Sequence, residues 1–350
     1  MTGGELRPTR LSGRWLASSL VVLFLAVVAG AVIGPADIDA GSVLASLVDR
    51  LPFVSVDTGL DGRQEAILWE LRMPRVVLGV LVGGMLALAG GAYQGAFRNP
   101  LADPYLLGVA AGAGLGATAA IAFAPATADW VIDPLPLAAF VGGLVGVAIT
   151  YAMGYSVRSG RTAVTLILAG VAVAAFLTAV QTYVLQRETE TLRQVYGWIL
   201  GRLSTVGWTE VLIVVPYVAV CSVTILAARR LLDVMSIGDS EAGALGLNPT
   251  RVRLVIVLAA TLGTAAAVAV SGLIAFVGII VPHAIRLAIG SSYRIVLPLS
   301  LILGGAFLVV ADILARTVIS PAELPIGVVT AFFGAPFFML VLRTSRGIAA

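Results

Sequence analysis

The feature that most constrains this chain is a series of long apolar runs with few or no charged residues. The segment 254–282, for example, contains no charged side chain. A helix of about 20 apolar residues is long enough to cross the hydrocarbon core of a bilayer. Because 59% of the 350 residues are hydrophobic and only 12% are charged, the chain offers many such runs. The sequence therefore predicts an all-α, polytopic membrane protein in which residues 1–350 form a single transmembrane domain.

The charges between the runs predict the direction of each span. Short loops rich in arginine stay on the cytoplasmic side. Three arginines precede the first run, a pattern shared by signal peptides and first membrane helices. The spans that follow favour an uncleaved first helix with a cytoplasmic N-terminus. The run 254–282 is compatible with one long tilted helix or with two passes that turn near Ser271 and Gly272. The positive-inside rule prefers two passes, which also places the C-terminus in the cytoplasm. The ten spans then lie at about 15–34, 75–96, 105–124, 135–155, 163–185, 209–228, twice within 254–282, 296–315 and 325–342.

Several classes of function are disfavoured by what the sequence lacks. All 22 basic residues are arginine, so no phosphate-binding GxxxxGK[ST] loop exists and the chain cannot be a Walker-type ATPase by itself. The arginines are spread through short loops, as membrane orientation requires, so nucleic-acid binding is not expected. Cys221 is the only cysteine, and neither an HExxH pair nor a GxSxG elbow occurs. We expect no catalytic residue, no metal site and no bound cofactor.

Few ionisable residues lie within the predicted spans, where such groups usually serve a function. Asp312 and Arg316 are four residues apart and are expected to pair on one helix face. His283, the only histidine, lies one turn before Arg286 and is interpreted as a structural residue. A self-sufficient secondary transporter remains an alternative that rests on Asp312 alone. A passive channel is a weaker one, because no charged ring is recognisable.

A polar segment, residues 236–253, separates two long apolar runs and has arginines on both flanks, which predicts a cytoplasmic position. We expect it to form two short capped helices, and hence a rigid projection. An ordinary inter-helix loop is an equally weighted alternative. The expected capping residues are Asp239 or Ser240 for a helix over 241–245, Gly246 at its end, and Asn248 followed by Pro249 for the next helix.

The sequence Arg72-Met-Pro-Arg75 places two arginines on the predicted outer side, against the usual inward bias of arginine. Guanidinium groups bind carboxylates in a two-pronged geometry, so one interpretation is that an acidic partner docks here. The other is that both arginines pair with Glu65 or Glu70, or contact lipid phosphates. The residues leave both interpretations open.

Glycines recur four residues apart in several predicted spans, as at Gly108, Gly112 and Gly116 and at Gly142 and Gly146. Small residues at this spacing allow two membrane helices to approach closely. We interpret them as ordinary helix packing.

Four stretches together resemble the FecCD-type permeases, the membrane subunits of bacterial ABC importers for iron–siderophore complexes, haem and vitamin B12. The resemblance covers nearly the whole chain, with the motifs in the same order. The stretches are the Arg72–Arg75 motif, Tyr93-Gln-Gly-Ala-Phe-Arg-Asn-Pro-Leu-Ala-Asp-Pro-Tyr-Leu-Leu-Gly108, Gly272-Leu-Ile-Ala-Phe-Val-Gly-Ile-Ile-Val-Pro-His-Ala-Ile-Arg286, and Ala311-Asp-Ile-Leu-Ala-Arg316 with the segment 321–336 that follows.

The resemblance implies a type II ABC importer permease fold with ten helices, in a bacterial cell membrane with both termini in the cytoplasm. It implies three kinds of protein partner: a second permease copy or paralogue, two cytoplasmic ATPase subunits that use the ATP, and an extracytoplasmic solute-binding protein. The chain itself would bind no cofactor. Iron–siderophore is the first expectation for the cargo, with haem and cobalamin as alternatives.

The resemblance also assigns site residues. ATPase coupling falls on Gly238, Asp239, Ser240, Glu241, Ala242, Gly243, Ala244, Leu245, Gly246 and Leu247; binding-protein docking on Arg72, Arg75 and Arg316; and a possible cytoplasmic gate on Thr162, Ala163, Val164 and Thr165.

Overall fold

The computed structural model describes residues 10–36, 38–50, 53, 55–124, 133–156, 163–203 and 207–345, and within these ranges the regular structure is entirely helical. The α-helices are α1 (Gly13–Val32), α2 (Ala40–Asp49), α3 (Gly62–Ala66), α4 (Met73–Phe97), α5 (Val109–Phe123), α6 (Pro134–Ser156), α7 (Ala163–Arg187), α8 (Leu192–Ile199), α9 (Thr209–Ala227), α10 (Arg229–Met235), α11 (Asp239–Ala244), α12 (Pro249–Ser271), α13 (Val277–Ala288), α14 (Tyr293–Thr317) and α15 (Ile326–Ser345). A π-helix, η1 (Ile67–Arg72), and two 3₁₀-helices, η2 (Pro104–Leu107) and η3 (Thr189–Thr191), complete the set.

Ten apolar helices account for the predicted spans. Seven of them, α1, α4, α6, α7, α9, α12 and α14, are long and apolar enough to cross a membrane. Of the shorter apolar helices, α5 and α13 lie between these in the chain and α15 follows α14, so the number of apolar helices at the predicted spans in the described ranges is consistent with about ten. The segment between the first two predicted spans contains α2, α3 and η1.

The long uncharged run folds as two passes. Helix α12 ends at Ser271, and α13 begins at Val277. Gly272, between them, has a φ of +68°, and a Cβ at this position would lie 2.1 Å from the carbonyl oxygen of Trp198. Only glycine fits such a turn. The predicted turn near Ser271 and Gly272, which divides the run into two helices, is therefore confirmed.

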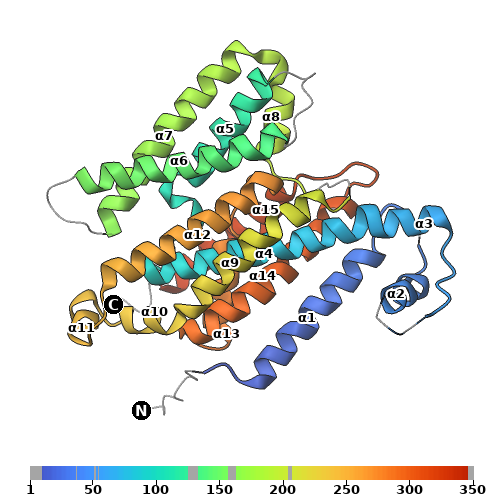
Figure 1. The fold of residues 1–350 in the computed structure, drawn as a ribbon, viewed down its shortest axis with the longest axis horizontal. Coiled ribbons are helices and arrows are strands. Elements are labelled where there is room, and N and C mark those ends of the chain that lie inside the picture. Colours follow the sequence, from blue (N-terminus) through green and yellow to red (C-terminus); the bar gives the residue numbers. More distant parts are fainter. Residues whose placement is uncertain are drawn as a thin grey trace.

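Helix α4 is the centre of the bundle. It packs against α9, α12, α13 and α14, and most of its residues are buried by the rest of the protein (Figure 1). Its glycines allow this packing, because a Cβ on Gly90 would lie 2.1 Å from the Gly278 oxygen of α13. A Cβ on Gly83 would lie 2.3 Å from the Gly304 oxygen of α14. The α4 backbone is therefore in direct contact with both neighbouring helices.

Helices α5, α6 and α7 form a second group on one side of this centre, while α1 lies on the opposite side against α14 (Figure 1). The glycine spacing seen in the sequence lies at the crossing of α5 and α6. A Cβ on Gly112 would be 2.2 Å from the Gly142 oxygen, and one on Gly116 would be 2.1 Å from the Ala138 oxygen. The interpretation of these glycines as helix packing is confirmed.

Candidate partner-binding sites

The polar segment forms a short helix at one end of the bundle, beside α10 and the start of α12 (Figure 1). The helix, α11, begins at Asp239, two residues earlier than predicted. Its N-cap is Gly238, with a φ of +145° and no side-chain cap, so the prediction that Asp239 or Ser240 caps it was wrong. The reason is that the Asp239 carboxylate is already bound elsewhere, to Arg253.

The end of α11 and the start of α12 follow the sequence prediction. Gly246 has a φ of +83°, the left-handed conformation expected after a helix. Asn248 Oδ1 accepts a hydrogen bond of 3.1 Å from the backbone N–H of Arg251, and Pro249 occupies the first turn. These contacts fix both ends of the turn between the two helices.

Asp239 of α11 is held by two arginines, of which Arg253 makes the shorter contacts. Arg253 Nη2 donates to both carboxylate oxygens of Asp239, at 3.0 and 2.9 Å. Its Nε donates to the Ala96 carbonyl oxygen, at 2.8 Å, in the last turn of α4. Charge-assisted hydrogen bonds of this kind are stronger than neutral ones. Arg98, which directly follows α4, also lies 3.7 Å from Asp239, so the side chains of Arg253 and Arg98 both join α11 to the end of α4.

Two large apolar side chains that flank α11 are exposed. Ala242 is fully buried against the bundle, whereas Ile237 and Leu245 are 62% and 69% exposed. Exposed large apolar residues on a rigid projection are typical of a protein-binding surface. The structure thus anchors α11 on one side and leaves the other side open.

A glycine pair in this segment gives a matched test of its rigidity. Gly246→Ala forces an alanine into a left-handed conformation, which costs about 1–2 kcal/mol. Gly243→Ala is the control. Gly243 lies within α11, a Cβ added there would have no atom within 4 Å, and alanine favours a helix more than glycine does. We expect ATP-dependent uptake to fall several-fold for Gly246→Ala only. The ratio of uptake to ATP hydrolysis in vesicles carrying the whole transporter measures this, and equal ratios for the two variants would contradict a need for a rigid turn.

At the opposite end of the bundle, Arg72 is buried and holds the end of α1. Its Nη1 donates to the carbonyl oxygens of Ala31 and Val32, at 3.0 and 2.8 Å, and its Nη2 donates to that of Ala36. A cation at a helix C-terminus is favoured by the helix dipole and by the unpaired carbonyl groups there. The side chain of Arg72 is thus directed into the protein.

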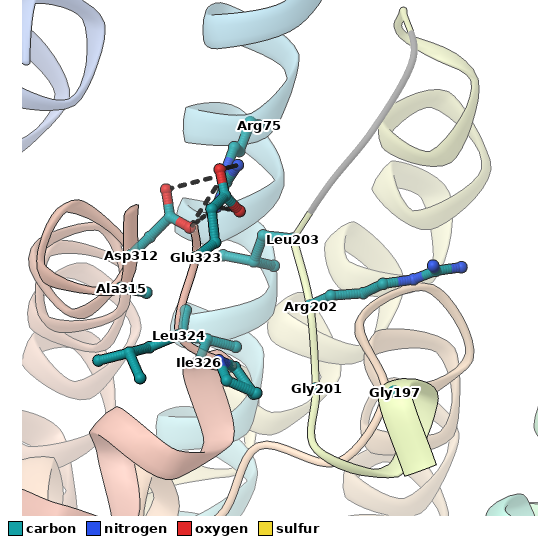
Figure 2. Close-up of a pocket in the computed structure, with 11 residues that line it drawn as sticks. Arg75, Gly197, Gly201, Arg202, Leu203, Asp312, Ala315, Glu323, Leu324 and Ile326 are labelled. Atoms are coloured by element: carbon teal, nitrogen blue, oxygen red, sulfur yellow. Dashed lines mark hydrogen bonds and ion pairs between the residues drawn. The ribbon is translucent and has the colours of Figure 1, made fainter. Parts of the chain in front are cut away.

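Arg75 lies between two carboxylates from distant parts of the chain. Its Nη1 and Nη2 donate to the two oxygens of Glu323, at 2.9 and 3.0 Å, in a two-pronged geometry. Its Nε and Nη2 also donate to Asp312, at 2.8 to 3.1 Å. Figure 2 shows Arg75 between Asp312 and Glu323, with Arg202 extending away from them beside a cavity of about 170 Å³.

Arg316 completes the outer cluster and is 2% exposed. Its Nη2 donates to the Gly30 carbonyl oxygen at 2.6 Å, and its Nε lies 3.5 Å from Asp312. The predicted pairing of Asp312 with Arg316 is confirmed. Asp312 is thus held between two arginines, which removes the free buried carboxylate that a secondary transporter would use.

The three predicted arginines converge, although they differ in access. A cleft of about 330 Å³ is lined by Arg72, Arg75, Arg316 and Glu323. Among the ion pairs of the described residues, none joins Glu65 or Glu70 to the Arg72–Arg75 motif, and Glu65 lies 3.5 Å from Arg50 instead. Contact with lipid phosphates stays a prediction. Sequence reasoning missed Glu323. The available signal was that Glu323 is the only acidic residue between the last two predicted spans.

The predicted gate segment is described only in part. Thr162 lies outside the described residues, as does the side chain of Ala163, at which α7 begins. Val164 is exposed, and Thr165 is half-buried. The gate assignment stays a prediction. His283 lies within α13, where its ring packs edge-on against Phe337 of α15, a structural position as interpreted from the sequence.

The described residues form a bundle of about ten apolar helices, with the short helix α11 at one end and an arginine–carboxylate cluster at the other. The comparison with known proteins gives the family. A model of the FecCD transport family matches residues 20–344. The chain belongs to the FecCD transport family.

Relatives in this family serve different import systems. The cobalamin import system permease protein BtuC of Halobacterium salinarum is 41% identical over 286 residues, covering 81% of this chain and 75% of the relative. The Fe(3+)-citrate import system permease protein YfmD of Bacillus subtilis is 36% identical and covers 89% and 91%. These are transport components and not enzymes, and this chain is one of them.

A solved structure shares the fold over nearly the whole chain. It is an ABC transporter assigned to the metal-chelate type and captured in an inward-facing conformation. The TM-score is 0.81 with 26% identity, covering 95% of this chain and all of the other.

Proposed function

We propose that this chain is the membrane-spanning subunit of an ATP-driven importer that carries a bulky metal chelate from a solute-binding protein into the cytoplasm. The observation that carries the proposal is the link from α11 through Arg253 to α4, because it joins an exposed surface to the helix at the centre of the bundle. Two ATPase subunits bind the α11 surfaces of a permease dimer, made with a second copy or a paralogue. Both termini of each chain lie in the cytoplasm.

Alternating access then requires that ATP and the loaded binding protein interact differently with the outward and inward arrangements of the helices. The apolar face of Ile237 and Leu245 fits a groove on the ATPase, and Ala242 transmits the movement inward. The residues proposed to couple are those assigned by resemblance, Gly238 to Leu247, with Arg253 added. The gate at residues 162–165 is retained as a proposal on resemblance alone.

Docking of the solute-binding protein centres on Arg75 in this proposal. Arg72 and Arg316 are buried and bound to carbonyl groups of the α1 end, whereas the Arg75 side chain is 14% exposed. Glu323, which is 42% exposed, accepts hydrogen bonds from Nη1 and Nη2 of Arg75, in the geometry that a partner carboxylate would adopt. An acidic residue of the binding protein therefore displaces Glu323 when it docks. Arg72 and Arg316 form the buried part of the cleft wall.

This proposal predicts opposite effects for two substitutions. Arg75→Gln removes a charge-assisted, two-pronged contact of about 1.5–3 kcal/mol, so we expect the affinity for the binding protein to fall about 10- to 100-fold. Glu323→Gln removes a competitor, so we expect the affinity to rise several-fold. Arg63→Gln, at an exposed arginine on the same side, is the control.

Affinities measured at low salt with the purified permease in lipid nanodiscs distinguish these cases. A normal affinity for Arg75→Gln would remove the docking assignment. An unchanged affinity for Glu323→Gln would contradict only the proposal that the partner's carboxylate displaces Glu323 from Arg75. Size-exclusion profiles of all three variants establish that the bundle is intact.

For the cargo, we propose an iron–siderophore complex, with haem and cobalamin as alternatives. A relative in a ferric citrate system and another in a cobalamin system both support a metal chelate and leave its identity to experiment. The test is uptake of radiolabelled chelates into vesicles that contain the permease, its ATPase and its binding protein. ATP-dependent uptake of one chelate identifies the cargo, and equal uptake without the ATPase would overturn the proposed function.

A further inference from the structure

A cavity lined by arginines lies at one face of the bundle, where three separate elements meet. Arg10 precedes α1, and Arg294 lies in the first turn of α14. Arg229 and Arg230 are the first two residues of α10. All four border one open cavity of about 600 Å³, named here the arginine cavity. Residues separated by more than 280 positions in the chain thus bring their guanidinium groups to one place.

The positive charge of the arginine cavity is only partly balanced. Among the described residues, Asp233 is the one carboxylate that forms an ion pair with these arginines, at 3.5 Å from the Arg294 Nε. Its two oxygens already accept hydrogen bonds from Ser292 Oγ and the Tyr293 N–H, at 2.9 and 2.7 Å. No ion pair within the described ranges involves Arg10, Arg229 or Arg230. The cavity therefore favours an anionic ligand.

The remaining wall of the arginine cavity is apolar. It is formed by Leu11, Leu16 and Pro298. The exposed face of α1 continues from it with Leu20 and Phe24, so the arginines adjoin apolar surface along the span. A second, apolar groove of about 370 Å³ borders the same end of α1 and includes Trp15 and Leu299. Tryptophan is enriched at the level of the lipid headgroups.

We propose that the arginine cavity binds the phosphodiester headgroup of an anionic phospholipid, whose acyl chains lie along α1 and α14. Arginine forks match phosphate geometry, and basic pockets between membrane helices suit anionic headgroups. The apolar wall and the position at the ends of α1, α9 and α14 favour a lipid over a free anion or the ATPase surface. This site is separate from the coupling and docking surfaces, and it does not depend on the proposed cargo.

The test measures lipid binding to the purified full-length permease by native mass spectrometry, with mixtures of phosphatidylglycerol and phosphatidylcholine. Arg229→Ala combined with Arg230→Ala is compared with Arg251→Ala combined with Arg343→Ala, which removes the same charge from exposed positions outside the cavity. We expect the first pair to weaken phosphatidylglycerol binding roughly 30-fold, about fivefold for each arginine. The control pair should stay within about twofold of the original protein. Leu16→Trp, which fills the cavity and keeps all four arginines, should also weaken binding.

Three results would overturn the proposal. One is equal phosphatidylglycerol binding by the two arginine pairs together with normal binding by Leu16→Trp. Another is that glycerol phosphate, which lacks acyl chains, competes as well as a short-chain phosphatidylglycerol, because the site would then bind a free anion. The last is that a photo-crosslinker at Leu16, in the assembled transporter, labels the ATPase subunit and not phospholipid.

Discussion

Arg253→Ala is expected to lower ATP-driven transport by at least about tenfold while the assembled transporter continues to hydrolyse ATP. The substitution removes the contact of Arg253 with Asp239 and its hydrogen bond to the Ala96 carbonyl. The partly exposed ion pair contributes about 0.2–1 kcal/mol, and the charge-assisted bond to Ala96 about 1.5–3 kcal/mol. Without both, the remaining side-chain ion pair between α11 and the end of α4 is the exposed one of Asp239 with Arg98, at 3.7 Å, which contributes little.

Arg251→Ala is the matched control. Arg251 lies about half a turn from Arg253 on the same helix, is exposed and makes no ion pair among the described residues. Asp239→Asn should give an intermediate loss, since Arg253 keeps its bond to Ala96. Uptake per ATP hydrolysed, in vesicles with all subunits present, is the measurement. If the Arg253→Ala and Arg251→Ala variants transport equally well, the contacts of Arg253 between α11 and α4 are not needed to couple ATP hydrolysis to transport.

Gly90→Ala is expected to cause the largest loss of stability. Its Cβ would lie 2.1 Å from the backbone oxygen of Gly278, so α4 and α13 would have to separate along a contact that no side-chain rotation relieves. Overpacking of this kind costs typically about 1–3 kcal/mol, and a backbone clash at the central helix belongs at the upper end. We expect a lower midpoint of thermal unfolding and a reduced yield of monodisperse protein.

Gly91→Ala is the control at the next residue. There the new Cβ would meet Leu297 Cδ2 at 3.1 Å, the end of a flexible side chain. Fluorescence-detected size exclusion after heating compares the two variants in the same detergent. Equal midpoints for Gly90→Ala and Gly91→Ala would mean that α4 and α13 are less tightly packed than the backbone contact implies.

The parts of the fold that the sequence predicts well are those determined by local chemistry. The apolar runs determine the spans, and the left-handed Gly246 and the Asn248 cap depend on neighbouring residues alone. Even the two passes within residues 254–282 follow from the distribution of arginines in short loops. Local patterns were sufficient wherever the constraint itself was local.

The partners of the arginines could not be predicted in the same way. Arg75 contacts Asp312 and Glu323, which are 237 and 248 positions away, and sequence distance gives no hint of such pairs. Arg72 bonds to backbone carbonyl groups, which every residue possesses and which leave no mark in the sequence. For the same reason the start of α11 was misplaced, because Asp239 is committed to a side chain on another helix.

The attachment of α1 affects how mutants of this protein will be interpreted. Its last carbonyl groups are held by Arg72 and Arg316, two of the three residues that the family resemblance assigns to docking. A genetic screen that scores lost import would therefore recover substitutions at both positions because the first helix detaches or inserts poorly, whatever happens at the outer surface. Only Arg75 separates recognition of a partner from biogenesis of the protein.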